Sequence, residues 1–121
     1  MKMTHFKIDI QLPLTYNPEK GKKVGEKVPE EYFLETYEEL LKMIQGISTS
    51  NIPIMGSWIH PKTRKRYNDK SLVFSVVVES GDIMTITNVP KIKELKQYKE
   101  TLKLRFKQEE IFMIATRCTW I

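Results

Sequence analysis

The chain has 121 residues, of which 40% are hydrophobic and 29% are charged, which is typical of one globular domain and unlike a disordered chain. No apolar run approaches the ~20 residues of a membrane span, and the single cysteine, Cys118, excludes an internal disulfide. The formal net charge of +5 permits an anionic partner without proving one. We therefore expect a soluble protein of the reducing cytoplasm, without a membrane partner.

The first part of the chain predicts a strand, a long loop and a helix. Apolar and polar residues alternate over 4–12, which predicts a strand with one apolar face. Residues 15–29, rich in lysine, proline and glycine, predict a long, mobile, polar loop. Apolar residues spaced by three and four over 30–45 predict a helix, whose five glutamates and one lysine give it a net charge of −4.

The middle of the chain predicts strands. Residues 47–60 predict an irregular strand, because Pro53 and Gly56 interrupt it. The nearly continuous apolar run at 72–79 predicts a strand near the centre of a sheet. After a turn, residues 83–87 predict a short extra strand.

The last elements complete a recognisable order. Residues 90–107 predict a second helix, in which six lysines and one arginine against two glutamates give a net charge of +5. Residues 110–121 predict a final strand. The order β-α-β-β-α-β predicts an α+β fold, a ferredoxin-like sandwich over residues 1–121 in which two helices cover one face of a four-stranded antiparallel sheet. The two helices would then lie side by side, and their opposite charges could pair at modest gain.

This arrangement leaves the other face of the sheet uncovered. The first strand would place His5, Lys7, Asp9 and Gln11 there, and the third strand would add either Val73, Val77 and Glu79 or its alternate residues. We expect the whole face to be too apolar to stand in water as one patch. The sequence therefore predicts a homodimer that packs sheet to sheet.

A basic segment lies between the second and third strands. Residues 62–70 hold five cations and one acid, a net charge of +4, in what is predicted to be a β-hairpin connection. Such a hairpin could follow phosphates while Tyr67 or Trp58 stacks a base, although charges at a hairpin tip are usually only solvated. The candidate nucleic-acid-binding residues are Lys62, Arg64, Lys65, Arg66 and Tyr67, with a possible extension to Lys91, Lys96 and Lys99 of the second helix.

The sequence shows no motif of a known chemistry. The two histidines, His5 and His60, are far apart and give no metal-ligand spacing with the one cysteine. A phosphate-binding glycine loop, a serine elbow and a Cys-x-x-Cys pair are also missing. We assign no catalytic residue, metal or cofactor and lean away from an enzyme. An enzyme or small-molecule binder stays open as an alternative, with His5, Lys7, Asp9 and Glu79 in a cavity between subunits.

The second half of the chain carries a longer pattern. Gly56 and Trp58 form a Gly-x-Trp strand, followed by a short charged hairpin, an apolar strand and a helix end with the residues Tyr98, Lys99, Arg105, Phe106, Gln108 and Glu109. Over roughly residues 54–121 this pattern resembles a family of small uncharacterised prokaryotic proteins. The resemblance implies a ferredoxin-like fold and assigns no activity. Lys107 stands where many of those proteins have glycine.

Three functions remain after these observations. The leading hypothesis is a homodimeric binding or interaction module of unknown specific role. The first alternative is a basic protein that binds RNA or DNA through the 62–70 hairpin. The second is the enzyme or small-molecule binder that would use the polar sheet face.

Overall fold

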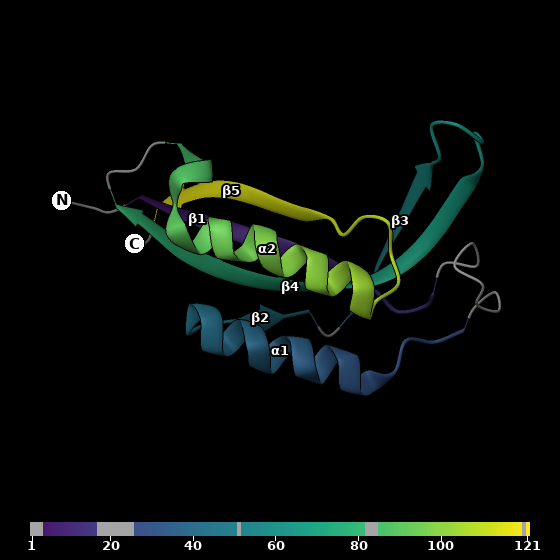
Figure 1. Cartoon of the computed structure of the whole chain (residues 1–121), viewed down its shortest axis with the longest axis horizontal. Helices are drawn as coiled ribbons and strands as arrows, with labels where there is room; N and C mark the ends of the chain where they lie inside the picture. The colour runs from purple at the N-terminus through teal and green to yellow at the C-terminus, as the bar shows by residue number, and fades with distance from the viewer. Residues whose placement is uncertain (1–3, 17–25, 51, 82–84, 120) are drawn as a thin grey trace.

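The structure is a computed structural model that describes residues 4–16, 26–50, 52–81, 85–119 and 121. In chain order its elements are β1 (Thr4–Pro13), α1 (Glu30–Ile44), β2 (Ser48–Thr49), β3 (Ile54–Ile59), β4 (Arg66–Gly81), the short 3-10 helix η2 (Ile86–Asn88), α2 (Pro90–Arg105) and β5 (Met113–Thr119) (Figure 1). Among the described residues no helix is long and apolar enough to cross a membrane.

The strands form one antiparallel sheet that is organised by β4. The order is β2-β4-β1-β5, and β3 pairs with the first part of β4. The two central strands, β1 and β4, contain the segments 4–12 and 72–79, whose sequences predict strands most clearly. Both helices lie on one face of this sheet (Figure 1). The prediction of an α+β, ferredoxin-like sandwich is confirmed.

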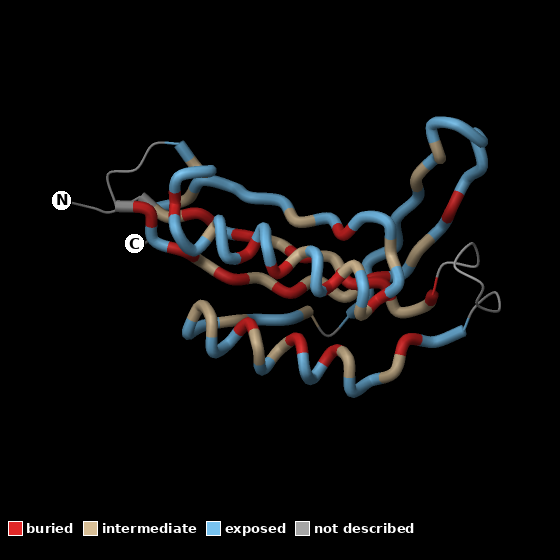
Figure 2. Tube along the Cα trace, in the orientation of Figure 1, coloured by how far each residue is buried: buried red, intermediate tan, exposed pale blue. Residues whose placement is uncertain are grey.

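The core lies between the sheet and the helices. Alternation along β1 and β4 turns Ile8, Ile10 and Val76 toward the helices, and each is at most 2% exposed. Phe106, just after α2, is fully buried, and its ring meets that of Phe33 edge-on at a centroid distance of 5.2 Å. Figure 2 shows buried residues along both central strands and on the inner sides of the helices. Each such side chain contributes roughly 1.5–3 kcal/mol through burial.

The two oppositely charged helices meet through one arginine. Arg105 Nη2 lies 2.7 Å from Glu39 Oε1 and 3.5 Å from Glu35 Oε1. Its Nη1 donates to Thr36 Oγ1 at 2.8 Å and to Tyr98 Oη at 3.1 Å, and the Tyr98 hydroxyl donates to Glu39 at 2.7 Å. The predicted pairing of the helices is present, and it is concentrated in this single cluster on α1 and α2.

The strand predictions for the middle of the chain need correction. Residues 47–60 form two strands, β2 and β3, because the chain leaves the sheet around Pro53. The predicted strand at 72–79 is the second half of β4, which begins at Arg66. The described part of 83–87 is not a strand, since Ile86–Asn88 form a 3-10 turn closed by the Asn88 N–H on the Thr85 carbonyl.

The predicted loop at 15–29 is anchored at both described ends. Tyr16 and Val28 are buried in the core, and the Tyr16 N–H donates to the Glu26 carbonyl at 2.8 Å. Residues 17–25 lie outside the described part of the chain, so the prediction of mobility for them is not addressed.

Candidate nucleic-acid interface

β3 and the first part of β4 form a two-stranded ribbon that extends away from the helices (Figure 1). We call this ribbon, residues 54–71, the arm. Its register runs from Ile54 opposite Ser71 to Ile59 opposite Arg66. The pairing of β1 with β4 ends where Pro13 lies opposite Ser71. Beyond that point the strands of the arm pair with each other, and the Leu14 N–H also donates to the Lys70 carbonyl at 2.9 Å.

The tip of the arm is closed by His60. The His60 N–H donates to the Lys65 carbonyl, and the Arg64 N–H donates to the His60 carbonyl, both at 2.9 Å. His60 Nδ1 accepts the backbone N–H groups of Lys62 at 3.1 Å and Thr63 at 3.3 Å. The imidazole therefore caps the turn, a role that the sequence did not suggest.

The predicted cationic residues gather on the arm as expected. Lys62, Arg64, Lys65 and Arg66 are all exposed. None of the four forms an ion pair with any residue in the described ranges. The Arg66 side chain donates to Asn68 Oδ1 at 3.2 Å and Ser57 Oγ at 3.4 Å, both uncharged. The full charge of the four side chains is thus available to an anion.

The aromatic residues of the arm hold its two strands together. Trp58 and Tyr67 lie opposite each other and stack at a centroid distance of 4.8 Å and an interplanar angle of 22°. Lys65 Nζ lies 5.7 Å from the Tyr67 centroid, and Trp58 Nε1 donates to Asp69 Oδ2 at 3.2 Å. Tyr67 is only 8% exposed, so it offers little surface for the base stacking that was predicted for it.

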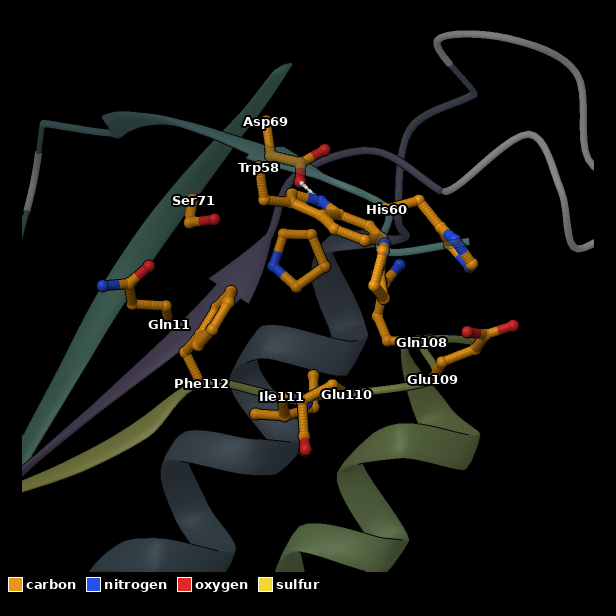
Figure 3. Close-up of a pocket in the computed structure, with 12 residues that line it drawn as sticks. Gln11, Trp58, His60, Asp69, Ser71, Gln108, Glu109, Glu110, Ile111 and Phe112 are labelled. Carbon is orange, nitrogen blue, oxygen red and sulfur yellow. Dashed lines mark hydrogen bonds between the residues drawn. The ribbon is translucent and has the colours of Figure 1, made fainter. Parts of the chain in front are cut away.

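A pocket of about 220 Å³ opens where the arm leaves the sheet (Figure 3). Its walls come from the end of β1, both strands of the arm and the connection between α2 and β5. We call it the corner pocket, and its principal lining residues are Gln11, Trp58, His60, Asp69, Gln108 and Phe112. The sequence pointed to Gln11, Trp58, His60 and Gln108, each for a reason other than this pocket. It gave no binding role to Asp69 or Phe112.

The carboxylates around the corner pocket differ in the hydrogen bonds and ion pairs that they form. Glu110 lies 2.6 Å from Lys99 Nζ and accepts the Ile111 N–H at 3.0 Å. The hydrogen bond from Lys99 is the main reason that the pKa of Glu110 is held below its ordinary value. Asp69 accepts from Trp58 through Oδ2 only, and its Oδ1 has no hydrogen-bond partner among the described residues. Asp69 Oδ1 can therefore accept a further hydrogen bond.

The residues proposed for a sheet-face cavity do share the uncovered face. Lys7 Nζ lies 3.6 Å from Asp9 Oδ1, which also accepts a 2.6 Å hydrogen bond from Ser75 Oγ. His5 lies opposite Glu79 in the pairing of β1 with β4. The space beside His5 and Glu79 is an open depression of about 400 Å³ that does not reach Asp9. In the described part of the single chain, no enclosed cavity is lined by all four of the proposed side chains, His5, Lys7, Asp9 and Glu79.

Metal ligands do not cluster in the described part of the chain. No group of three or more histidine, cysteine, aspartate or glutamate side chains is placed there to hold an ion.

Comparisons with family models, with curated proteins and with solved structures found no match to this chain. The resemblance to a family of uncharacterised prokaryotic proteins therefore stays a prediction. Its marked positions take structural roles here, since Trp58 stacks within the arm and Arg105 joins the helices.

Proposed function

We propose that this protein binds nucleic acid through the arm. The observation that carries the proposal is the set of four exposed arm cations, Lys62, Arg64, Lys65 and Arg66, which have no acidic partner among the described residues. Phosphate contacts from lysine and arginine supply most of the sequence-independent affinity of nucleic-acid-binding proteins. A two-stranded ribbon is also narrow enough to enter a DNA major groove or to run along a single strand.

The basic helix α2 is a weaker candidate for the same contact. Lys91 pairs with Glu94 at 3.3 Å, and Lys103 pairs with Glu100 at 3.2 Å. Lys99 is held by Glu110. Much of the charge of α2 is thus balanced locally, whereas the charge of the arm is not.

The test is a fluorescence anisotropy titration of labelled RNA and DNA oligomers at about 50 and about 200 mM salt. We expect salt-sensitive binding, with a slope of log affinity against log salt of roughly −3 to −4 if four phosphates are contacted. A variant with Lys62, Arg64, Lys65 and Arg66 all changed to alanine should lose most of the affinity and most of that slope.

The matched control removes four charges from the exposed helix surfaces, with Lys42, Lys91, Lys93 and Lys96 changed to alanine. This variant should keep most of the binding. Equal losses in the two variants would show that only net charge matters, and an absence of binding at low salt would end the proposal.

A second function is favoured by a different observation. Neither helix covers the sheet face on the far side from α1 and α2, and in the described residues this face mixes Val73, Val77 and Ile114 with His5 and Asp9. Ile114 is 52% exposed there. We infer that two copies of this chain pair through this face, because a second copy would remove those apolar side chains from water.

A further inference from the structure

The corner pocket and the cationic tip are continuous along the chain. His60 and Pro61 line the pocket, and Lys62 follows directly. We propose that the corner pocket receives one unstacked nucleobase of a single-stranded nucleic acid whose phosphates contact the arm. This inference rests on the proposed function and adds to it the class of nucleic acid and the place of a base.

The size of the pocket suits a single base. Its volume of about 220 Å³ is below the roughly 300–1,000 Å³ of pockets that enclose a drug-sized ligand. Trp58 from β3 and Phe112 from the segment before β5 both line it (Figure 3). Phe112 is 52% exposed, which is unusual for so large an apolar ring. Aromatic side chains of this kind are the platforms on which proteins stack unpaired bases.

The polar groups favour a base over a phosphate. Asp69 and Glu109 bring negative charge to the pocket, which repels a phosphate and directs it toward the arm cations. Asp69 Oδ1 can accept a hydrogen bond from an amino group on a base edge, and Gln11 presents an amide that can donate and accept. Cytosine, adenine and guanine carry such an amino group, whereas uracil and thymine do not. We therefore expect the pocket to prefer the amino-bearing bases.

A base can enter this pocket only after it has left its stack. In a duplex the required unstacking costs a few kcal/mol, whereas a single strand offers its bases at much lower cost. The pocket therefore makes a single strand a better ligand than a duplex of the same length.

The test compares Phe112→Ala with Leu104→Ala. Leu104 is an 81% exposed apolar residue of α2 that does not line the pocket and lies outside the sheet face proposed for pairing. The probes are a fluorescent single-stranded oligomer of deoxycytidine and a duplex of equal length. Phe112→Ala should weaken single-strand binding by roughly 5- to 100-fold. Its salt slope should stay unchanged, because no phosphate contact is lost. Leu104→Ala should stay within about twofold of the unchanged chain, and melting curves check that both variants are folded.

A second variant, Asp69→Asn, tests the base preference. The amide oxygen can still accept from Trp58 Nε1, but the negative acceptor is lost. The ratio of deoxycytidine to thymidine oligomer affinities should therefore fall toward one.

The outcomes separate this inference from the proposed function. If neither probe binds the unchanged chain, the proposed function fails and the base site fails with it. If binding depends on the arm cations but Phe112→Ala behaves like Leu104→Ala, only the base site is overturned. A preference for the duplex would overturn the base site as well.

Discussion

Lys107 adopts a backbone conformation that suits glycine better than lysine. Its φ is 52°, in the left-handed region, where it follows α2 and the fully buried Phe106. The Gln108 N–H donates to the Lys103 carbonyl at 2.9 Å and so closes the helix end around it. A residue with a Cβ atom pays about 1 kcal/mol or more for this conformation. This conformation gives a physical reason for glycine to be favoured at this position.

We predict that Lys107→Gly is more stable than Lys107→Ala by about 1 kcal/mol. Both changes remove the same charge from the end of α2, so the comparison isolates the effect of the Cβ atom. Urea unfolding of the two variants gives the difference in the free energy of unfolding. If the alanine variant were equally stable, the left-handed conformation of Lys107 would carry no strain.

Tyr98 links the stability of the protein to alkaline pH. Burial, followed by the hydrogen bond that it donates to Glu39, raises the pKa of Tyr98 from 10.0 to about 12. The folded state thus favours the protonated phenol. The resulting stabilisation is complete below pH 10 and is lost as the pH rises from about 10 to about 12, because the unfolded chain ionises first.

The variant Tyr98→Phe removes this ionisation. We predict that the free energy of unfolding falls more steeply between pH 10 and 12 in the unchanged chain than in Tyr98→Phe. Chemical unfolding at a series of pH values measures both curves. Parallel curves would mean that Tyr98 ionises equally easily in the folded and unfolded states.

At the scale of elements, the tip of the arm depends on the His60 imidazole as an acceptor. His60→Ala should expose the backbone N–H groups of Lys62 and Thr63, and we predict that their hydrogen exchange accelerates roughly 2- to 10-fold. His60→Asn is the control, because its short side chain can accept the same N–H groups in a turn. Exchange followed by NMR measures both variants. Similar rates in all three proteins would show that the backbone closes the turn alone.

The elements that follow local patterns were predictable, and those that depend on distant partners were not. The alternation of β1 gave its buried face, since Ile8 and Ile10 are in the core. The polar residue Thr36 is fully buried on α1, because its hydroxyl donates to the Tyr32 carbonyl and accepts from Arg105. Its partner on α2 is 69 residues away, beyond the reach of any local pattern.

The same distinction holds at the scale of the whole molecule for the candidate site. The arm cations Lys62, Arg64, Lys65 and Arg66 lie within five residues of the chain, so their clustering follows from the sequence alone. The corner pocket joins Gln11, Trp58, Asp69 and Phe112. These residues meet only because β1, the arm and the segment before β5 are brought next to one another in the folded sheet. Asp69 lies in β4 opposite Gly56 of β3. No spacing in the sequence indicates that juxtaposition.

The proposed pairing of two copies is a property of the whole sheet. Val77 lies at its centre, opposite Lys7 of β1. We predict that Val77→Lys converts a dimer into a monomer at about 10 µM, because two lysines would be buried face to face without a partner. Leu34→Lys is the control, since Leu34 is a 61% exposed apolar residue on α1, away from this face. Light scattering after size-exclusion chromatography measures the mass of each. A stable interface needs roughly 1,000 Å² of buried surface, so a monomeric unchanged chain would show that this mixed face is stable in water and would leave the arm as the surface that binds.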